Sequence, residues 1–336
     1  MGPPGFRLVN WILRNRGVAK YNFTESGLPE PPLREMGVDT SFETFSRLED
    51  DHEARLAGTV ASLYDVRPDN VVITSGASEA IFLVYLVLGR GKAVVPLPNY
   101  EPMFTIPRWL GMKVTSKPGD AAVPGAVYGL TDPNNPTGAR LPGVDSLAKL
   151  AGKSTVFVNE TYRGFTFEKP ATLTSQHERI VTCNTMTKFY GLGRLRVGWI
   201  IADRERAERL QRGRRLISGH SSEYSLWLAN EVLQRRAGFV RRARKIHSEN
   251  LSVVRRFAGA TSRVRVTLPE AAPFCLCRYP SGPSSVVLAE RLLQDTGVLV
   301  SPGDYFGAPK SFRLCFTGSK DELEEGTQAL ADRLGR

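Results

Sequence analysis

One lysine is distinguished by the polar residues that surround it. Lys188 lies in the segment "TMTKFYGLGRLRVG" (185–198), directly after a short apolar run, with Thr185 before it and Arg196 eight residues after it. A lysine amine can form a Schiff base with a carbonyl compound. An arginine and nearby hydroxyl groups suit a phosphate. The grouping favours a reactive lysine beside a phosphate site over a structural lysine in a loop.

Three other short segments place polar or small residues at the ends of apolar runs. In "TSGASEA" (74–80), small residues allow a tight turn into a helix, and the free N–H groups of a helix start can hold a phosphate. In "TDPNNPTGA" (131–139), a proline-rich turn presents asparagines. "VFVNETY" (156–162) ends in an amide, a carboxylate and a phenol. Each segment taken alone is also compatible with an ordinary connection.

The elements that must position these segments follow an alternating pattern. Short apolar runs alternate with helical stretches, the runs at 70–74, 93–97, 126–130, 155–159, 180–184 and 197–202, and the helices at 77–88, 101–111 and 144–151. This pattern predicts an α/β fold with a mostly parallel sheet and helices on both faces. Ligands bind at the C-terminal ends of the strands in such folds, where the polar segments fall.

A different pattern begins after residue 203. Arginine-rich helices are followed by a long helical segment from about residue 225 to 257, and then by a compact mixture of strands and helices. We therefore expect a larger domain and a smaller α+β domain. The expected divisions are an N-terminal segment over 1–40 that packs on the small domain or a partner subunit, a large domain over 41–225, a linking helix over 226–258 and a small domain over 259–336.

Composition narrows the class of protein. The 336 residues, 41% hydrophobic and 24% charged, are typical of a soluble protein. The longest apolar stretch, 81–89, is far shorter than the roughly 20 residues of a spanning helix, so we expect no membrane association. The four cysteines are too few and scattered for a disulfide framework, which favours a reduced, cytoplasmic protein. The four histidines lack metal-ligand spacing, so no metal site is expected.

The formal charge of +11 raises the question of nucleic-acid binding. Much of the excess lies in 203–216 and 234–247, where arginines recur at helical spacing with apolar residues between them. Such spacing is typical of a solvated helix face. We expect no nucleic-acid partner, and small anionic ligands account for part of the charge.

The order of the motifs resembles that of the fold-type I pyridoxal-phosphate (PLP) enzymes in the class I/II aminotransferase family, including aspartate and histidinol-phosphate aminotransferases. The resemblance runs from about residue 70 to 203 and returns near 313. It implies the PLP-transferase fold and a Schiff base at Lys188. The other cofactor contacts that it implies are the phosphate turn Gly76, Ala77 and Ser78, the stacking ring Tyr100, the 3′-oxygen partners Asn135 and Tyr162, the ring-nitrogen partner Asn159, and the phosphate ligands Thr185 and Arg196. For the substrate, it implies Gly27 near the bound amino acid and Arg313 on its carboxylate.

Two features depart from the family's pattern. The family's "D-E-A-Y" matches Asn159-Glu160-Thr161-Tyr162, so an amide stands where an aspartate normally keeps the cofactor ring protonated as an electron sink. Glu160 should point to the opposite face of its strand. The family also borrows a tyrosine from the partner subunit for the phosphate, whereas residues 35–62 contain no tyrosine.

The resemblance implies an aminotransferase that acts on an amino acid and a 2-oxo acid, and a homodimer. The departure at Asn159 leaves two alternatives open. One is a decarboxylase or lyase of the same fold that resembles threonine-phosphate decarboxylase. The other is a PLP-binding protein with little catalysis. The sequence does not indicate which amino acid is the substrate.

Overall fold

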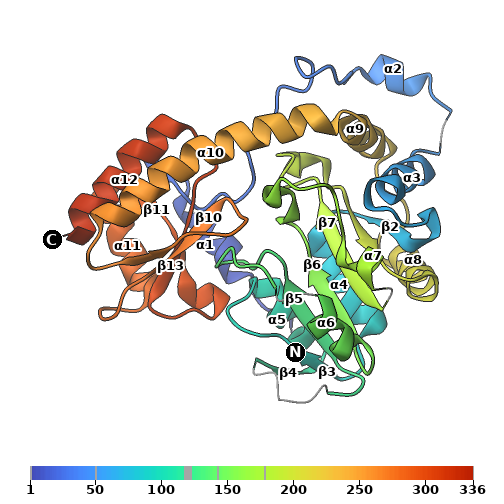
Figure 1. Cartoon of the computed structure of the whole chain (residues 1–336), viewed down its shortest axis with the longest axis horizontal. Helices are drawn as coiled ribbons and strands as arrows, with labels where there is room; N and C mark the ends of the chain where they lie inside the picture. Colours follow the sequence, from blue (N-terminus) through green and yellow to red (C-terminus); the bar gives the residue numbers. More distant parts are fainter. Residues whose placement is uncertain (1, 50, 117–122, 142–143, 178, 336) are drawn as a thin grey trace.

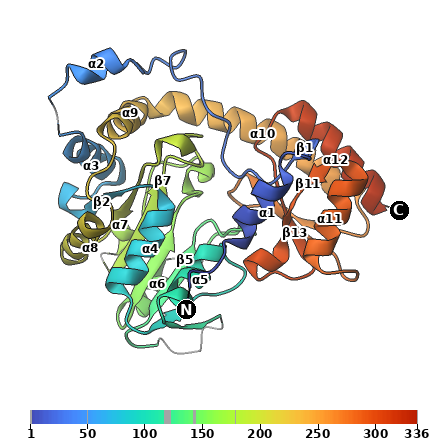
Figure 2. The same ribbon diagram turned by 180° about the vertical axis from the view of Figure 1, so that it is seen from behind.

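A computed structural model describes residues 2–49, 51–116, 123–141, 144–177 and 179–335 (Figure 1). A seven-stranded sheet and a smaller four-stranded sheet lie on opposite sides of the molecule, and the long helix α10 (Arg236–Ala260) runs from one to the other. The N-terminal helix α1 (Arg7–Asn15) lies between the two parts, as the reverse view also shows (Figure 2).

The large sheet has the strand order β2-β8-β7-β6-β5-β3-β4. Only β8 runs antiparallel to its neighbours, so the predicted α/β class with a mostly parallel sheet is confirmed. The strands are β2 (Val71–Thr74), β3 (Lys92–Val94), β4 (Lys113–Thr115), β5 (Val127–Thr131), β6 (Thr155–Asn159), β7 (Ile180–Thr185) and β8 (Gly198–Ile201).

Helices cover both faces of this sheet because successive strand residues alternate in direction. In β6, Phe157 packs with residues of α4, α5 and α8, whereas Val156 and Val158 pack with residues of α6 and α7. These helices are α4 (Ala77–Leu88), α5 (Glu101–Trp109), α6 (Val144–Ala151), α7 (Leu173–Gln176) and α8 (Arg204–Ser218). Burial on both faces explains why the strands read as continuous apolar runs.

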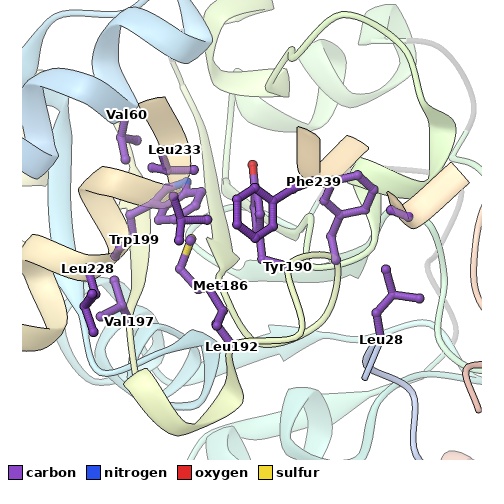
Figure 3. Packing of buried hydrophobic residues seen from close by; sticks show 14 of the residues in the cluster. Leu28, Val60, Met186, Tyr190, Leu192, Val197, Trp199, Leu228, Leu233 and Phe239 are labelled. Atoms are coloured by element: carbon purple, nitrogen blue, oxygen red, sulfur yellow. The ribbon is translucent and has the colours of Figure 1, made fainter. Parts of the chain in front are cut away.

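A further core cluster holds the loop that follows β7 (Figure 3). Met186, Tyr190 and Leu192 come from that loop and are at most 6% exposed. They pack with residues of α3 (His52–Tyr64), α9 (Glu223–Gln234) and α10. Leu28, from the N-terminal segment, joins the same cluster. The backbone on both sides of Lys188 is therefore fixed by apolar packing.

The smaller part contains the antiparallel sheet β12-β13-β10-β9 and two helices. Its elements are β9 (Arg265–Thr267), β10 (Phe274–Arg278), α11 (Ser285–Thr296), β12 (Ser301–Pro302), β13 (Ser311–Cys315) and α12 (Lys320–Gly335). The N-terminal strand β1 (Tyr21–Asn22) pairs in parallel with β11 (Val298–Leu299), which ties the chain start to this part. The helical segment expected from about residue 225 is two helices, because α9 ends at Gln234 and α10 starts at Arg236.

Helix α1 is attached by long-range polar contacts as well as by apolar packing. The Trp11 indole donates a hydrogen bond to the Val300 carbonyl (2.9 Å), and the Glu101 carboxylate accepts one from the Leu8 amide (3.0 Å). The short helix α2 (Phe42–Ser46) projects at the periphery of the large part (Figures 1 and 2). Within the described ranges, no helix is long and apolar enough to cross a membrane.

Candidate active site

A cavity of about 330 Å³ lies where the C-terminal ends of β5, β6 and β7 face α1 and the small sheet. All the residues predicted for the site line it except Gly27 and Gly76, which lie directly behind its wall. A larger hollow of about 780 Å³ between α3 and α8 contains none of them. The structure thus brings together residues that are spread over almost 290 positions of the chain, from Gly27 to Arg313.

One end of the cavity has the features of a phosphate site. Gly76 precedes α4 with a φ of +83° and contributes no side-chain cap, so the helix start remains open toward the cavity. The Arg196 Nη2 atom donates to the Ser75 carbonyl (3.1 Å), and a Cβ on Gly76 would lie 3.0 Å from that nitrogen. Glycine therefore permits the close approach of the guanidinium to the helix start. Thr185 lines the same end, with its hydroxyl bonded to the Val197 carbonyl (2.9 Å).

Lys188 lies half-buried at the cavity, three residues after the end of β7. The Leu28 amide donates to the Lys188 carbonyl (2.9 Å), so the N-terminal segment crosses directly over the lysine backbone. A Cβ on Gly27 would lie 2.9 Å from the Thr187 carbonyl oxygen and 3.5 Å from the Lys188 Cα. Only a glycine fits at this crossing without a shift of one of the two segments.

Asn159, 3% exposed, lines the cavity at the end of β6. Its Oδ1 accepts two hydrogen bonds from Thr161, one from the backbone N–H (3.1 Å) and one from the hydroxyl (2.6 Å). The amide nitrogen has no protein partner among the described residues. The side chain therefore presents a free donor, because its acceptor is already engaged.

Glu160 points away from the cavity. Its carboxylate accepts a hydrogen bond from the Leu173 amide (2.9 Å) and lies 3.3 Å from the Arg163 guanidinium. Burial raises the pKa of Glu160 to about 7, and the positive charge of Arg163 offsets only part of that effect. Glu160 is thus a structural carboxyl behind the site, and it cannot replace the missing charge at Asn159.

Tyr162 and Asn135, the two residues expected to bond the cofactor's 3′ oxygen, both line the cavity and already have protein partners. The Tyr162 hydroxyl donates to the Ser26 hydroxyl (2.8 Å), and the Asn135 Oδ1 accepts from Arg313 Nη1 (2.9 Å). Tyr162 is 3% exposed, and its ring packs edge-to-face against Phe274, with centroids 4.8 Å apart. Both polar side chains are oriented before any ligand binds.

Arg313 is a buried guanidinium that lacks a carboxylate partner within the described ranges. It is 2% exposed and lies against the rings of Phe274 and Phe306, 5.3 and 4.9 Å from their centroids. Besides Asn135, it donates to the Thr24 carbonyl (3.0 Å). No ion pair involves it in the described part of the chain, and its Nε has no partner. An unpaired buried charge is costly, so the site is suited to a ligand carboxylate.

Tyr100 and α1 form the remaining walls. The Tyr100 ring lies edge-to-face against Phe6, with centroids 5.8 Å apart, and burial raises the pKa of the Tyr100 phenol well above its ordinary value. One side of α1 and its two flanking residues, Phe6 and Arg16, line the cavity. The side chains from the helix itself are apolar: Leu8, Val9, Ile12 and Leu13.

Thr161, Ser26 and the side chains of α1 line the cavity or contact its walls although the sequence motifs predict no site role for them. Thr161 lies inside the segment that matches the family's "D-E-A-Y", and its difference from the family's alanine is the sequence signal that could have identified it. The position of α1 could not be read from local pattern, because the contacts of Leu8 and Arg7 with Glu101 span more than 90 residues.

These residues fit PLP. The open start of α4 with Arg196 suits its phosphate, Lys188 its aldehyde, and Tyr100 and Asn159 its ring. The cradle at Gly76 and the unpartnered Asn159 nitrogen are features that a bound ligand would complete.

The comparisons with known proteins agree with this geometry. A family model described as aminotransferase class I and II matches residues 39–330. The chain is 26% identical to capreomycidine synthase from Streptomyces vinaceus, over 96% of this chain and 89% of that protein. It is 24% identical to aspartate aminotransferase from Thermococcus kodakarensis, over 98% of this chain and 93% of that protein. Its fold matches that of a PLP-dependent aminotransferase from Streptococcus suis with a TM-score of 0.91, at 21% identity and full coverage of both chains.

Proposed function

Because the chain belongs to the PLP-dependent aminotransferase class I and II family, we propose that it transfers an amino group between an amino acid and a 2-oxo acid. One observation carries the proposal. Lys188 shares a single cavity with a phosphate cradle at the start of α4 and with Arg313, which has no ion-pair partner among the described residues. That arrangement suits a cofactor phosphate and a substrate carboxylate bound in the same cavity as one amine.

When bound, the cofactor supplies a carbonyl for the amine and a conjugated ring that draws electrons from the substrate α-carbon. In the proposal, Arg313 binds the α-carboxylate through a two-pronged ionic hydrogen bond. Lys188 would then remove the α-proton as a general base and, as a general acid, deliver a proton to the former aldehyde carbon of the cofactor. Tyr100, Arg196 and Thr185 line the cavity. Tyr100 would cover one face of the cofactor ring, and Arg196 and Thr185 would hold its phosphate.

The wall formed by α1 supports a preference among amino donors. Val9, Ile12 and Leu13 line the cavity, and Val9 and Leu13 are 37% and 55% exposed. Contact with a substrate side chain would bury this apolar surface, at about 25 cal/mol per Å². We therefore propose that donors with apolar side chains of medium length react faster than donors with small polar ones.

A donor screen tests the proposal. Purified protein loaded with PLP is mixed with single amino acids, and both the cofactor absorbance and the 2-oxo acid released are followed. An absorbance change accompanied by stoichiometric 2-oxo acid, reversed by a second 2-oxo acid, is the expected result. Cofactor absorbance that no amino acid changes would contradict transamination.

A second candidate is other PLP chemistry in the same site. It is favoured by the uncharged Asn159 at the ring-nitrogen position and by a relative that is named a synthase rather than an aminotransferase. A decarboxylase would release carbon dioxide without 2-oxo acid. An eliminating lyase would release a side-chain fragment together with ammonia, and it would need no second 2-oxo acid to regenerate the cofactor aldehyde. A weakly catalytic PLP-binding protein would bind the cofactor and form none of these products.

The homodimer and the cytoplasmic location expected from the sequence remain predictions. The lack of a tyrosine in 35–62 means that a partner subunit would need another residue to reach the phosphate. Light scattering of the cofactor-loaded protein at micromolar concentration tests the dimer directly.

A further inference from the structure

The two positions at which the "D-E-A-Y" motif changes here are in contact with each other. Asn159 replaces the aspartate and Thr161 the alanine, and the Thr161 hydroxyl lies 2.6 Å from the Asn159 Oδ1. An alanine has no group that could make this hydrogen bond. The second change therefore acts on the first.

The identity of the amide atom is fixed by chemistry. The Thr161 backbone N–H, 3.1 Å from the side chain of Asn159, can only donate, so the atom facing it must be the carbonyl oxygen. The hydrogen bond from this backbone N–H to the side chain two residues earlier forms an Asx turn, which is common and does not require a hydroxyl. The hydroxyl adds a second donor to the same oxygen, and a reversed amide would place its NH₂ group against the backbone N–H and deprive the hydroxyl of its acceptor.

We propose that Thr161 is a positioning residue that holds the Asn159 amide nitrogen toward the cavity, so that the ring nitrogen of the bound cofactor accepts a hydrogen bond and stays unprotonated. This inference rests on the proposed function only in requiring bound PLP. A protonated ring nitrogen would face the amide donor with a donor of its own, which is unfavourable. The carboxylate usual in the family has the opposite effect, because it attracts the ring proton.

The direct test is nitrogen NMR of protein reconstituted with PLP labelled with ¹⁵N in the ring. Free labelled cofactor in acid and in alkali supplies the two reference shifts. The wild type should match the unprotonated reference from pH 6 to 9, and Asn159→Asp should move toward the protonated one. A protonated nitrogen in the wild type would overturn the inference while leaving the proposed function intact. Failure of the wild type to bind PLP would contradict the proposed function itself, and this inference with it.

Two variants of Thr161 isolate the hydroxyl. Thr161→Val keeps the side-chain shape without the hydroxyl, and Thr161→Ser keeps the hydroxyl. Loss of one hydrogen bond should weaken PLP binding about fivefold in Thr161→Val, whereas Thr161→Ser should restore binding to within about twofold of wild type. Equal PLP affinity of Thr161→Val and wild type, with unchanged circular dichroism, would refute the positioning role of the hydroxyl.

Discussion

At the residue scale, the proposed chemistry depends on the uncharged side chain at position 159, which lines the cavity. Its Oδ1 is held by Thr161, and its nitrogen faces the place expected for the cofactor ring. We predict that Asn159→Asp raises the transamination rate about tenfold, since about 1.4 kcal/mol of added transition-state stabilisation corresponds to that factor. The Thr161 donors would keep the new carboxylate ionised.

Single-turnover kinetics with one amino donor measures this effect. Asn159→Ala is the matched control, because alanine has neither the amide of the wild type nor the carboxylate of Asn159→Asp, and it should be slower than wild type. An Asn159→Asp rate equal to or below that of wild type would show that the enzyme is adapted to the amide.

A second prediction at the residue scale concerns Glu160 and the pH dependence of the free energy of unfolding. Its folded pKa of about 7 lies above the ordinary value of 4.5, so the folded state binds more protons than the unfolded state between those two pH values. Stability must then fall as pH rises through this window, by up to about 3 kcal/mol. Glu160→Gln should remove this component of the pH dependence.

Urea unfolding at pH 4.5, 6 and 7.5 measures the slope for both proteins. Glu25→Gln is a suitable control, because Glu25 is an exposed residue near the same cavity. An identical pH slope in wild type and Glu160→Gln would contradict the assignment.

At the element scale, α1 is held at its N-terminus by a carboxylate from another helix. The helix has no side-chain cap of its own, and the buried Glu101 at the start of α5 accepts hydrogen bonds from the Leu8 amide (3.0 Å) and the Arg7 guanidinium (2.8 Å). A negative charge there also complements the helix dipole. The apolar cavity wall formed by α1 is therefore held in place by Glu101, which is about 90 residues away in sequence.

We predict that Glu101→Ala destabilises the protein by about 1–3 kcal/mol, because it leaves buried N–H groups unpaired. It should also raise the KM for apolar amino donors more than it lowers kcat, since α1 lines the cavity without contacting Lys188 in this account. Arg7→Ala is the control. Arg7→Ala removes one donor but leaves the Leu8 amide bonded to the buried Glu101 carboxylate, so it should cost less than Glu101→Ala. Equal effects of the two substitutions on KM would refute the anchoring role of Glu101.

At the scale of the whole molecule, Arg313 joins the two parts of the fold. From β13 of the small sheet, it reaches Asn135 after β5 of the large sheet and the Thr24 carbonyl of the N-terminal segment. A ligand carboxylate bound to Arg313 would thus stabilise the arrangement of both parts.

We predict that a non-reactive monocarboxylate with an apolar side chain, at about 100 times its Kd, raises the Tm by about 2 °C or more, from roughly 2.7 kcal/mol of binding free energy. Arg313→Lys should lose the shift because an ammonium group lacks the planar fork. Arg256→Lys, a conservative change at an exposed arginine, should retain it. A full shift in Arg313→Lys would contradict carboxylate binding at this residue.

The sequence predicted much of this architecture, and the reasons for its failures are physical. Strand ends of a parallel sheet converge at one edge, so residues after β5, β6 and β7 could be brought together from order alone. The strand β4 was missed because Lys113 and Thr115 are exposed and polar, as befits a short edge strand. The break between α9 and α10 was missed because Arg235 gives no local sign of it.

The side-chain partners could not be predicted in the same way. Nothing in the motif shows that Thr161 donates twice to Asn159, or that Arg313 lacks an acidic partner among the described residues, because both statements depend on three-dimensional contacts. The motif identifies the residues, whereas their hydrogen bonds can be seen only in the folded structure.

The central claim is that Lys188 carries the cofactor. Borohydride reduction of the PLP-loaded protein, followed by peptide mass mapping, tests it most directly. The account predicts one pyridoxyl group, on the peptide that contains Lys188, and none in Lys188→Ala treated in the same way. A label on any other lysine, or an unmodified Lys188 peptide in protein that retains the cofactor, would contradict it.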